Sequence, residues 1–140
     1  MRDDAGLFNF VRLSTPKNAQ FLVPPDLEHF RLEGERAIVV DFKGLPMNKA
    51  GQIEWYQRLE HISGTIHPKN MDVVRHGYLT LDARRLEKVR CEYGVTYVVL
   101  RAGQPLSAPG WNDVFRNNSF RVMSYREHYT CPPQMPQSPN

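Results

Sequence analysis

Two short apolar runs that flank a helical segment constrain the fold of this chain more than any other feature. The first run spans 21–23 and the second spans 38–40. Each ends abruptly in a polar or proline-containing loop, which is typical of short strands buried in a sheet. Between the runs, Asp26 is a good N-cap for a helical turn, and Gly34 allows the chain to leave it. The stretch Gln20–Lys43 therefore predicts a buried strand, a short helical crossover and a second buried strand.

Helices are expected on both sides of this stretch. Near the N-terminus, Asp3 can cap a helix that ends at Thr15-Pro16, because the residue before a proline avoids helical geometry. Asn48 and Asp82 are good N-caps for two later helices. Apolar residues follow both caps at helical spacing, and Gly94 is the left-handed residue expected at the end of the second of these helices.

The C-terminal half adds two expected strands. Residues 95–100 form the strongest strand pattern, and residues 120–125 alternate between apolar and polar side chains, which is typical of an edge strand. The segment 102–118 between them holds two prolines and two glycines and is expected to be a loop. The weakly patterned segment 65–80 is expected to add one helical turn, from Met71 to His76.

The order of these elements predicts the fold class. Strands and helices alternate until the last pair of strands, so we expect one α/β domain over 1–128 with helices on both faces of a small sheet. The sheet should have four strands and be mostly parallel, a Rossmann-like three-layer arrangement in which the last strand is the candidate for an antiparallel neighbour. From residue 129 to 140 the sequence is rich in proline and lacks an apolar pattern, which predicts disorder.

Composition and charge exclude several classes of protein. The chain has 140 residues, 41% of them hydrophobic, which suits one globular domain. The formal charge is +3, and the most basic run, 84–90, is broken by acidic and apolar residues, so a nucleic-acid partner is not expected. No stretch is long and apolar enough for a membrane helix, and the N-terminus lacks the apolar core of a signal peptide.

The two cysteines, Cys91 and Cys131, fit neither a zinc pattern nor a CxxC motif. An oxidising compartment would allow a disulfide between them, but their placement in a helix and in the C-terminal segment favours two unpaired thiols.

The candidate binding residues follow from the expected sheet. Ligands of open α/β sheets bind beyond the carboxyl ends of the strands, and these ends place polar side chains along one rim. Paired acids and bases there suit proton transfer or the binding of a phosphate or carboxylate. In the alternative reading, Asp26 is only a helix cap and Asp41 pairs with Lys43 or Arg36. The candidate ligand-binding residues are Asp26, Arg31, Arg36, Asp41, Lys43, Trp55 and Arg58.

The last two candidates belong to a second group, on the helix after Asn48. Glu54 and Arg58 stand four residues apart with the acid first, the favourable order for an ion pair on a helix. Trp55 beside them could stack on a sugar or on Arg31. Alternatively it is one of the apolar residues of this helix, in place of Tyr56.

Motifs for catalysis or for a cofactor are absent from the sequence. The five histidines show no HExxH or HxH spacing, and neither a GxSxG elbow nor a glycine-rich phosphate loop is present. We therefore expect no metal, no cofactor, no catalytic residue and no enzymatic activity.

Several phrases of the chain resemble a known group of proteins. Residues 10–12 followed by 15–19 are similar to the "helix, then Thr-Pro-x-(Asp/Asn)-Ala" phrase that opens the C-terminal domains of many bacterial polytopic membrane proteins, among them GT-C glycosyltransferases. Residues 93–99 and 120–125 resemble later strands of the same domains. A narrower likeness to one uncharacterised subfamily involves 21–25, 30–31, Arg36, 40–43, Pro46, 54–55 and Arg58.

This resemblance implies a soluble, non-catalytic accessory domain whose partner is the membrane-embedded portion of its parent protein. In GT-C enzymes the catalytic carboxylate belongs to the membrane portion, so no catalytic residue carries over. The implied location is extracytoplasmic (periplasmic) if these residues are part of such a protein, and cytoplasmic if the chain is native as given.

Three hypotheses about function follow. The first is the accessory domain, which would pack on a transferase or transporter or bind its saccharide substrate. The second is a stand-alone domain that binds an anionic ligand at the strand rim. The third is structural: the rim residues would form a buried ion-pair network without a ligand.

Overall fold

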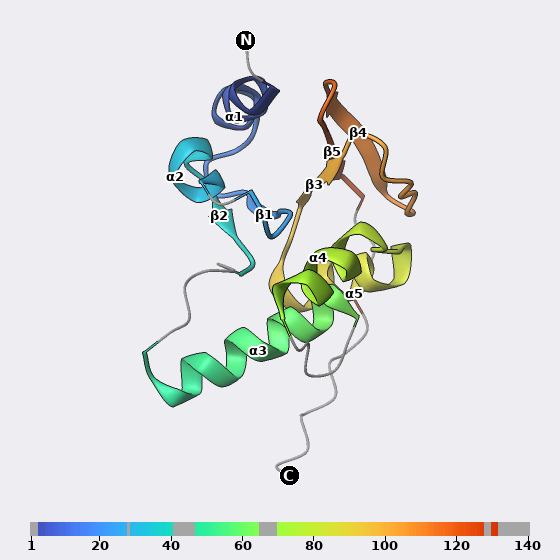
Figure 1. Cartoon of the computed structure of the whole chain (residues 1–140). Coiled ribbons are helices and arrows are strands. Elements are labelled where there is room, and N and C mark those ends of the chain that lie inside the picture. Colours follow the sequence, from blue (N-terminus) through green and yellow to red (C-terminus); the bar gives the residue numbers. More distant parts are fainter. Residues whose placement is uncertain (1–2, 28, 41–46, 65–69, 128–129, 132–140) are drawn as a thin grey trace.

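A computed structural model describes residues 3–27, 29–40, 47–64, 70–127 and 130–131. Helices and strands alternate as far as β2, and then three consecutive helices and three consecutive strands follow (Figure 1). In chain order they are α1 (Asp3–Ser14), β1 (Gln20–Leu22), α2 (Phe30–Gly34), β2 (Ala37–Ile38), α3 (Lys49–Ser63), α4 (Met71–Leu79), α5 (Ala83–Tyr93), β3 (Tyr97–Arg101), β4 (Trp111–Arg116) and β5 (Phe120–Tyr125).

The strands form one mixed sheet in the order β2-β1-β3-β5-β4. β1 is parallel to both β2 and β3, whereas β5 is antiparallel to β3 and to β4. The α/β class is therefore confirmed, and so is the antiparallel pairing of the last strand. The prediction of four mostly parallel strands is wrong, because the sheet has five and its C-terminal part is an antiparallel hairpin.

The strand that sequence reasoning missed is β4, which lies inside the segment 102–118 that was expected to be a loop. Its central residues include Asn112 and Asp113, types that are depleted in strands. As an edge strand it exposes both of these side chains to solvent. Because β4 takes the edge, β5 is an inner strand, so the expectation that 120–125 forms an edge strand is also wrong.

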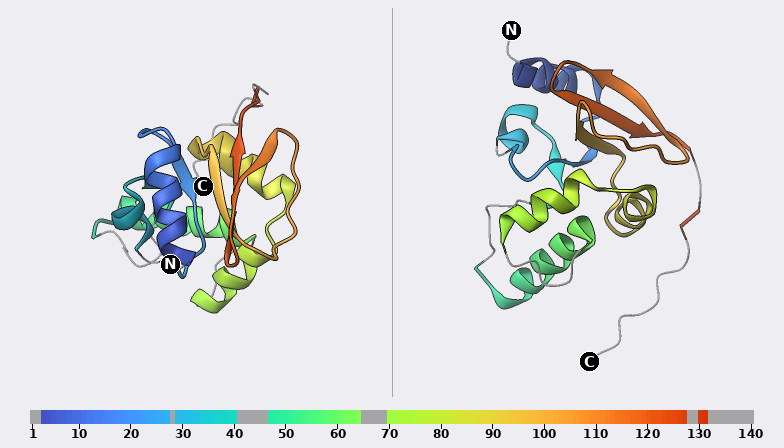
Figure 2. Two further views of the ribbon diagram at one scale, coloured as in Figure 1. Left: turned by 90° about the horizontal axis from the view of Figure 1, so that it is seen from above. Right: turned by 45° about the vertical axis from the view of Figure 1, so that its right-hand side comes forward.

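Helices cover both faces of the sheet, as expected. Leu7 and Val11 of α1 and Phe30 of α2 pack on one face, against Phe21, Val99 and Val122. The helices α3, α4 and α5 lie together on the other side (Figure 2). There Ile62, Val74 and Leu86 pack against Leu22 and Val98. Phe21 and Leu22 belong to different clusters, so β1 is buried on both faces.

Most helix boundaries agree with the sequence signals. The side chains of Asn48 and Asp82 accept hydrogen bonds from the backbone at the starts of α3 and α5, and Gly64 and Gly94 end these helices in left-handed geometry. Within the described residues, no helix is long and apolar enough to cross a membrane.

Two expectations for the crossover helix α2 are wrong. The helix begins after His29, which makes no side-chain cap, and Asp26 bonds to Arg101 instead of capping it. The left-handed residue that ends α2 is Glu35 at φ 55°, and Gly34 is the last helical residue. Gly34 is buried, and a Cβ there would lie 3.3 Å from Val11, so tight packing on α1 explains the glycine.

The two cysteines are joined by a disulfide, so the expectation of unpaired thiols is wrong. Cys91 lies on α5, and the bond ties the segment after β5 back to that helix. The expected boundary between a domain over 1–128 and a disordered segment over 129–140 stays a prediction, since 128–129 and 132–140 lie outside the described residues.

Candidate functional site

The carboxyl ends of β1, β2 and β3 meet at one rim of the sheet. β1 lies between β2 and β3. After β1 the chain first forms β2 on one side of it, and later forms β3 on its other side. Such a change of direction marks the place where open α/β sheets bind ligands. Here Tyr78 of α4 fills that place: its side chain is buried, and its hydroxyl donates to the carbonyl oxygen of Val99 and lies 3.3 Å from that of Leu22.

An ion pair lies beside Tyr78 at the same rim. Arg101, at the end of β3, donates to the carboxylate of Asp26, which follows β1, at 2.5 Å. The guanidinium also lies 5.1 Å from the ring centroid of Phe120. Burial raises the pKa of the Tyr78 hydroxyl well above its usual value, so this group stays protonated and acts as a donor. An anion at this part of the rim would have to displace Asp26 from Arg101.

Two other predicted site residues lie on α3, close to the end of β2. Arg58 donates to the carbonyl oxygen of Val39, just past β2, and pairs with Glu54 at 2.6 Å, as the spacing predicts. Trp55 is partly buried and packs against the core beneath α3, whereas Tyr56 is 48% exposed, so Trp55 is the core residue of this helix. Asp41 and Lys43 lie outside the described residues, and their role at the rim stays a prediction.

The remaining two candidates are not part of this site. Arg31 is exposed on α2, which packs on the opposite face of the sheet from α3. Arg36 precedes β2 and therefore lies at the other end of the parallel strands, so the prediction that it belongs to the rim is wrong.

Arg36 instead caps the C-terminus of α1. Its guanidinium is buried and donates to the carbonyl oxygens of Arg12 and Thr15 at 3.1 and 2.8 Å, and to the Thr15 hydroxyl at 3.1 Å. The last carbonyls of a helix lack partners within it, and a cation there also complements the helix dipole. Arg36 thus fixes the end of α1 against the start of β2.

Replacing Arg36 by leucine should lower the free energy of unfolding by about 2 kcal/mol, because buried carbonyl oxygens would lose their donors. Urea denaturation measures this change. Arg31→Leu, at an exposed arginine only five positions away, is the matched control and should change stability by less than about 0.5 kcal/mol. Equal effects of the two substitutions would contradict the capping role.

A polar groove between α3 and α5 continues from Arg58. It encloses about 440 Å³ and is lined by Ala50, Ile53, Glu54, Gln57, His61, Glu92 and Tyr93. The guanidinium of Arg58 lies 4.9 Å from the ring centroid of Tyr93. Arg58 therefore links the carboxyl end of β2 to the groove.

Three groove residues form a hydrogen-bonded cluster. Nδ1 of His61 lies 2.7 Å from the hydroxyl of Tyr93 and 3.0 Å from Oε2 of Glu92. Burial, with a smaller contribution from Glu92, raises the pKa of Tyr93 to about 12, and burial lowers the pKa of His61 against the opposing charge of Glu92. Near neutral pH the phenol is protonated and the imidazole is neutral. Because a carboxylate only accepts, Nδ1 carries the imidazole hydrogen.

The groove can hydrogen-bond a neutral polar ligand. Its carboxylates, amide, phenol and imidazole offer both donors and acceptors, and Ala50 and Ile53 offer apolar surface. Sequence reasoning identified only the Glu54–Arg58 side of this site. It missed His61, Glu92 and Tyr93 because they come from two helices about thirty residues apart and match no motif. The sequence signal available for them was the acidic and aromatic pair Glu92-Tyr93 at the end of α5.

Acid should destabilise the fold through His61. The unfolded chain binds a proton at this residue near pH 6.5, and the folded chain does so only at lower pH. The contribution of His61 is therefore complete above about pH 6.5 and is lost as the pH falls toward the folded pKa. His61→Gln should flatten the loss of stability between pH 7.5 and 5, measured by urea denaturation at each pH. A profile that changes in His76→Gln but not in His61→Gln would contradict this assignment.

The first part of the chain is similar to a known domain family. Residues 2–62 match a family model. The family is described as a domain of unknown function, DUF6798, and the match runs from α1 through most of α3. It includes Arg36, Trp55 and Arg58 but not the α5 side of the groove. A search of curated proteins found no match to the chain. Residues 2–62 are thus similar to a domain of unknown function, and this similarity indicates no activity.

Proposed function

We propose that this chain is a non-catalytic accessory domain that works outside the cytoplasm. It packs against the membrane-embedded portion of a bacterial membrane protein of the GT-C-like kind that its sequence resembles. In this proposal it binds the saccharide substrate of that protein in the groove between α3 and α5.

The Cys91–Cys131 disulfide is the observation that carries the proposal. Disulfides form and persist in oxidising compartments and are rare in the cytosol. The bond joins α5 to a segment 40 residues further along the chain, so it is a long-range link within the fold. The sequence leaves two locations open, extracytoplasmic and cytoplasmic. The disulfide supports the extracytoplasmic location.

The chemistry of the groove supports a saccharide rather than an anion. Glu54 and Glu92 give two carboxylates to the lining, and Gln57, His61 and Tyr93 add uncharged donors and acceptors near neutral pH. Sugar hydroxyl groups pair with such side chains, whereas the Glu92 carboxylate repels an anion and the charge of Glu54 is already paired with Arg58.

The DNA upstream of the Met1 codon tests the membrane partner. An open frame that encodes several membrane spans and runs into this domain is the expected result. A stop codon and a ribosome-binding site directly before Met1 would overturn this part of the proposal.

Saccharide binding is tested by NMR titration of the domain with a panel of neutral mono- and disaccharides. We expect saturable shifts at Gln57, Glu92 and Tyr93 that are lost in Gln57→Ala and Glu92→Gln. Asp72→Asn removes an exposed carboxylate from α4 and should leave binding unchanged. Shifts that persist in both groove variants would exclude this groove as the site.

A further inference from the structure

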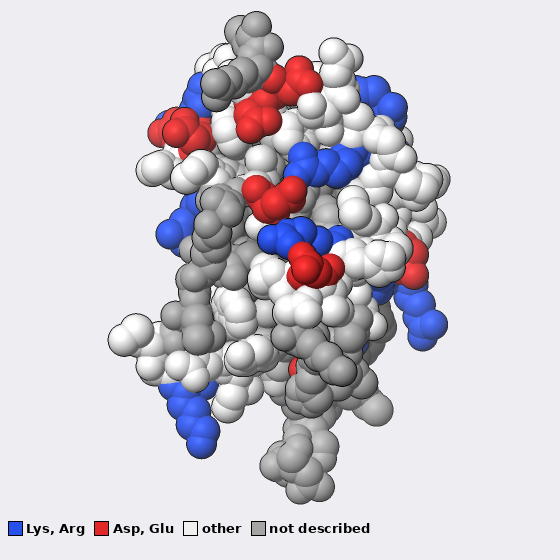
Figure 3. All heavy atoms as spheres, in the orientation of Figure 1, with Lys and Arg blue, Asp and Glu red and all other residues white. Residues whose placement is uncertain are grey.

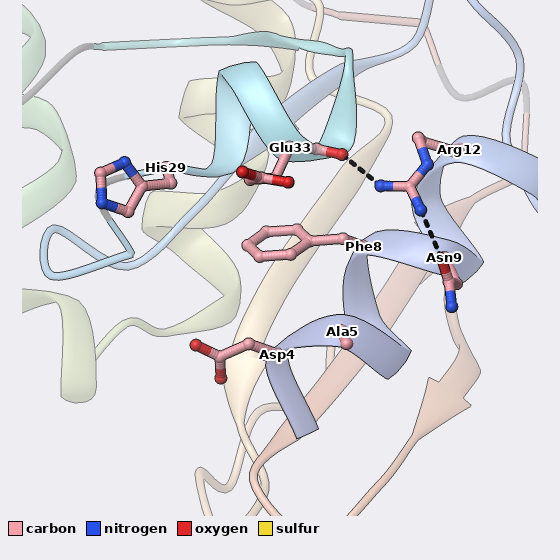
Figure 4. Close-up of a pocket in the computed structure, with 7 residues that line it drawn as sticks. All are labelled: Asp4, Ala5, Phe8, Asn9, Arg12, His29 and Glu33. Atoms are coloured by element: carbon pink, nitrogen blue, oxygen red, sulfur yellow. Dashed lines mark hydrogen bonds between the residues drawn. The ribbon is translucent and has the colours of Figure 1, made fainter. Parts of the chain in front are cut away.

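The helices α1 and α2 enclose a second pocket, on the other face of the sheet. It has a volume of about 310 Å³ and is lined by Asp4, Ala5, Phe8, Asn9, Arg12, His29 and Glu33. Figure 4 shows the ring of Phe8 between the carboxylates of Asp4 and Glu33, with His29 beyond the end of the ring. The pocket thus combines an aromatic surface with two negative charges.

The aromatic surface is held in place by the core. Phe8 is partly buried and packs against Phe30 with 6.1 Å between ring centroids, and Phe30 in turn packs against Phe21 of β1. A ring fixed in this way offers its π-system to a cation without a loss of its own freedom.

The two carboxylates are available to a ligand. Among the residues that the structure describes, neither Asp4 nor Glu33 has a cationic partner. Two neighbouring acidic side chains, Asp3 and Glu35, do have partners. Asp3 accepts from the hydroxyl of Ser119 at 2.5 Å, and Glu35 lies 3.8 Å from Arg12. Figure 3 shows acidic side chains over α1 and beside α2, with basic side chains next to some of them.

The arginine in the pocket does not neutralise them. Arg12 donates to the backbone oxygen of Glu33 at 2.6 Å and to the side chain of Asn9. In Figure 4 it lies at one end of the pocket, while the carboxylates of Asp4 and Glu33 are turned toward the opposite end. The end near His29 therefore carries two carboxylates beside an aromatic ring.

We propose that this pocket binds the cationic end of an alkyl chain, a primary ammonium or a guanidinium group. The carboxylates accept its N–H donors, and the methylene groups pack on Phe8 and Ala5. This site lies on α1 and α2 and does not depend on the saccharide groove of α3 and α5.

The test is an NMR titration of the whole chain with n-butylammonium chloride, with n-butanol and sodium butyrate as neutral and anionic probes of equal size. We expect saturable shifts at Ala5, Phe8 and His29 with the ammonium only. Asp4→Asn and Glu33→Gln should each weaken binding about three-fold, as for exposed charge pairs. Phe8→Leu should weaken it by a similar factor, and Asp72→Asn should have no effect.

Equal binding of butanol and butylammonium, or affinity unchanged in the Asp4→Asn/Glu33→Gln double variant, would overturn the proposal. Absence of saturable shifts with butylammonium would also overturn it. Asp4 would then have only its favourable interaction with the dipole of α1, in whose first turn it lies. A lysine-containing tripeptide separates the two sources of such a group. Tighter binding than the free amine assigns the site to a basic side chain of a partner, and equal binding assigns it to a small amine.

Discussion

Removing the disulfide between Cys91 and Cys131 should lower the free energy of unfolding by about 4 kcal/mol. The bond closes a loop with a sequence separation of 40, and without it the unfolded chain gains the corresponding conformational entropy. A loss of this size is a large fraction of the stability of an ordinary domain. Urea denaturation of the Cys91→Ser/Cys131→Ser double variant measures it.

Reduction provides the control for this prediction. Wild-type protein denatured in the presence of dithiothreitol should match the double variant, because both lack the same bond, and dithiothreitol should leave the variant unchanged. A difference below about 1 kcal/mol between oxidised and reduced protein would contradict a structural role for the disulfide.

Gly77→Ala should destabilise the fold by about 3 kcal/mol, at the upper end of the range for overpacking. Gly77 is the point where α4 crosses the end of α3, and a Cβ there would lie 2.2 Å from the backbone oxygen of Ser63 and 2.6 Å from its Cα. Both atoms belong to the backbone, so the helices would have to move apart.

Whether Gly77→Ala lowers or raises the stability shows whether the close contact between α3 and α4 exists. In the middle of a helix, replacing glycine by alanine ordinarily stabilises by about 0.5–1 kcal/mol, so a loss identifies the close contact. Gly6→Ala, within α1, is the matched control, since a Cβ there would meet only the side chain of Asn117, at an ordinary contact distance of 3.6 Å. Thermal unfolding of both variants measures the difference, and a Gly77→Ala protein as stable as the wild type would show that α3 and α4 do not approach this closely.

The sequence predicts those parts of the fold that local chemistry determines. Caps such as Asn48 and Asp82 and stop signals such as Gly94 act within a few residues, and the helices begin and end where these residues indicate. The edge strand β4 escapes prediction because its partner β5 supplies the pairing that Asn112 and Asp113 disfavour locally. The disulfide escapes for the same reason, since only the fold brings Cys131 to α5.

In the candidate site, too, local features follow from the sequence, whereas long-range contacts do not. The pair Glu54–Arg58 follows from helical spacing and is present. Asp26 lies at the expected rim, but its partner Arg101 comes from a strand 75 residues away. Arg36 could not be placed from sequence, because its function as a cap for α1 depends on how β2 packs beside the end of that helix. Sequence thus identifies polar residues near strand ends without identifying their partners.

The redox state of Cys91 and Cys131 in living cells shows whether this domain works outside the cytoplasm. Cells of the source organism are quenched in acid, free thiols are blocked with light iodoacetamide, and the remaining thiols are labelled with heavy iodoacetamide after reduction. Mass spectrometry of the two cysteine peptides then reads the original state. An extracytoplasmic domain predicts heavy label on both peptides. Light label on both would show that the domain resides in a reducing compartment and would contradict the proposed function.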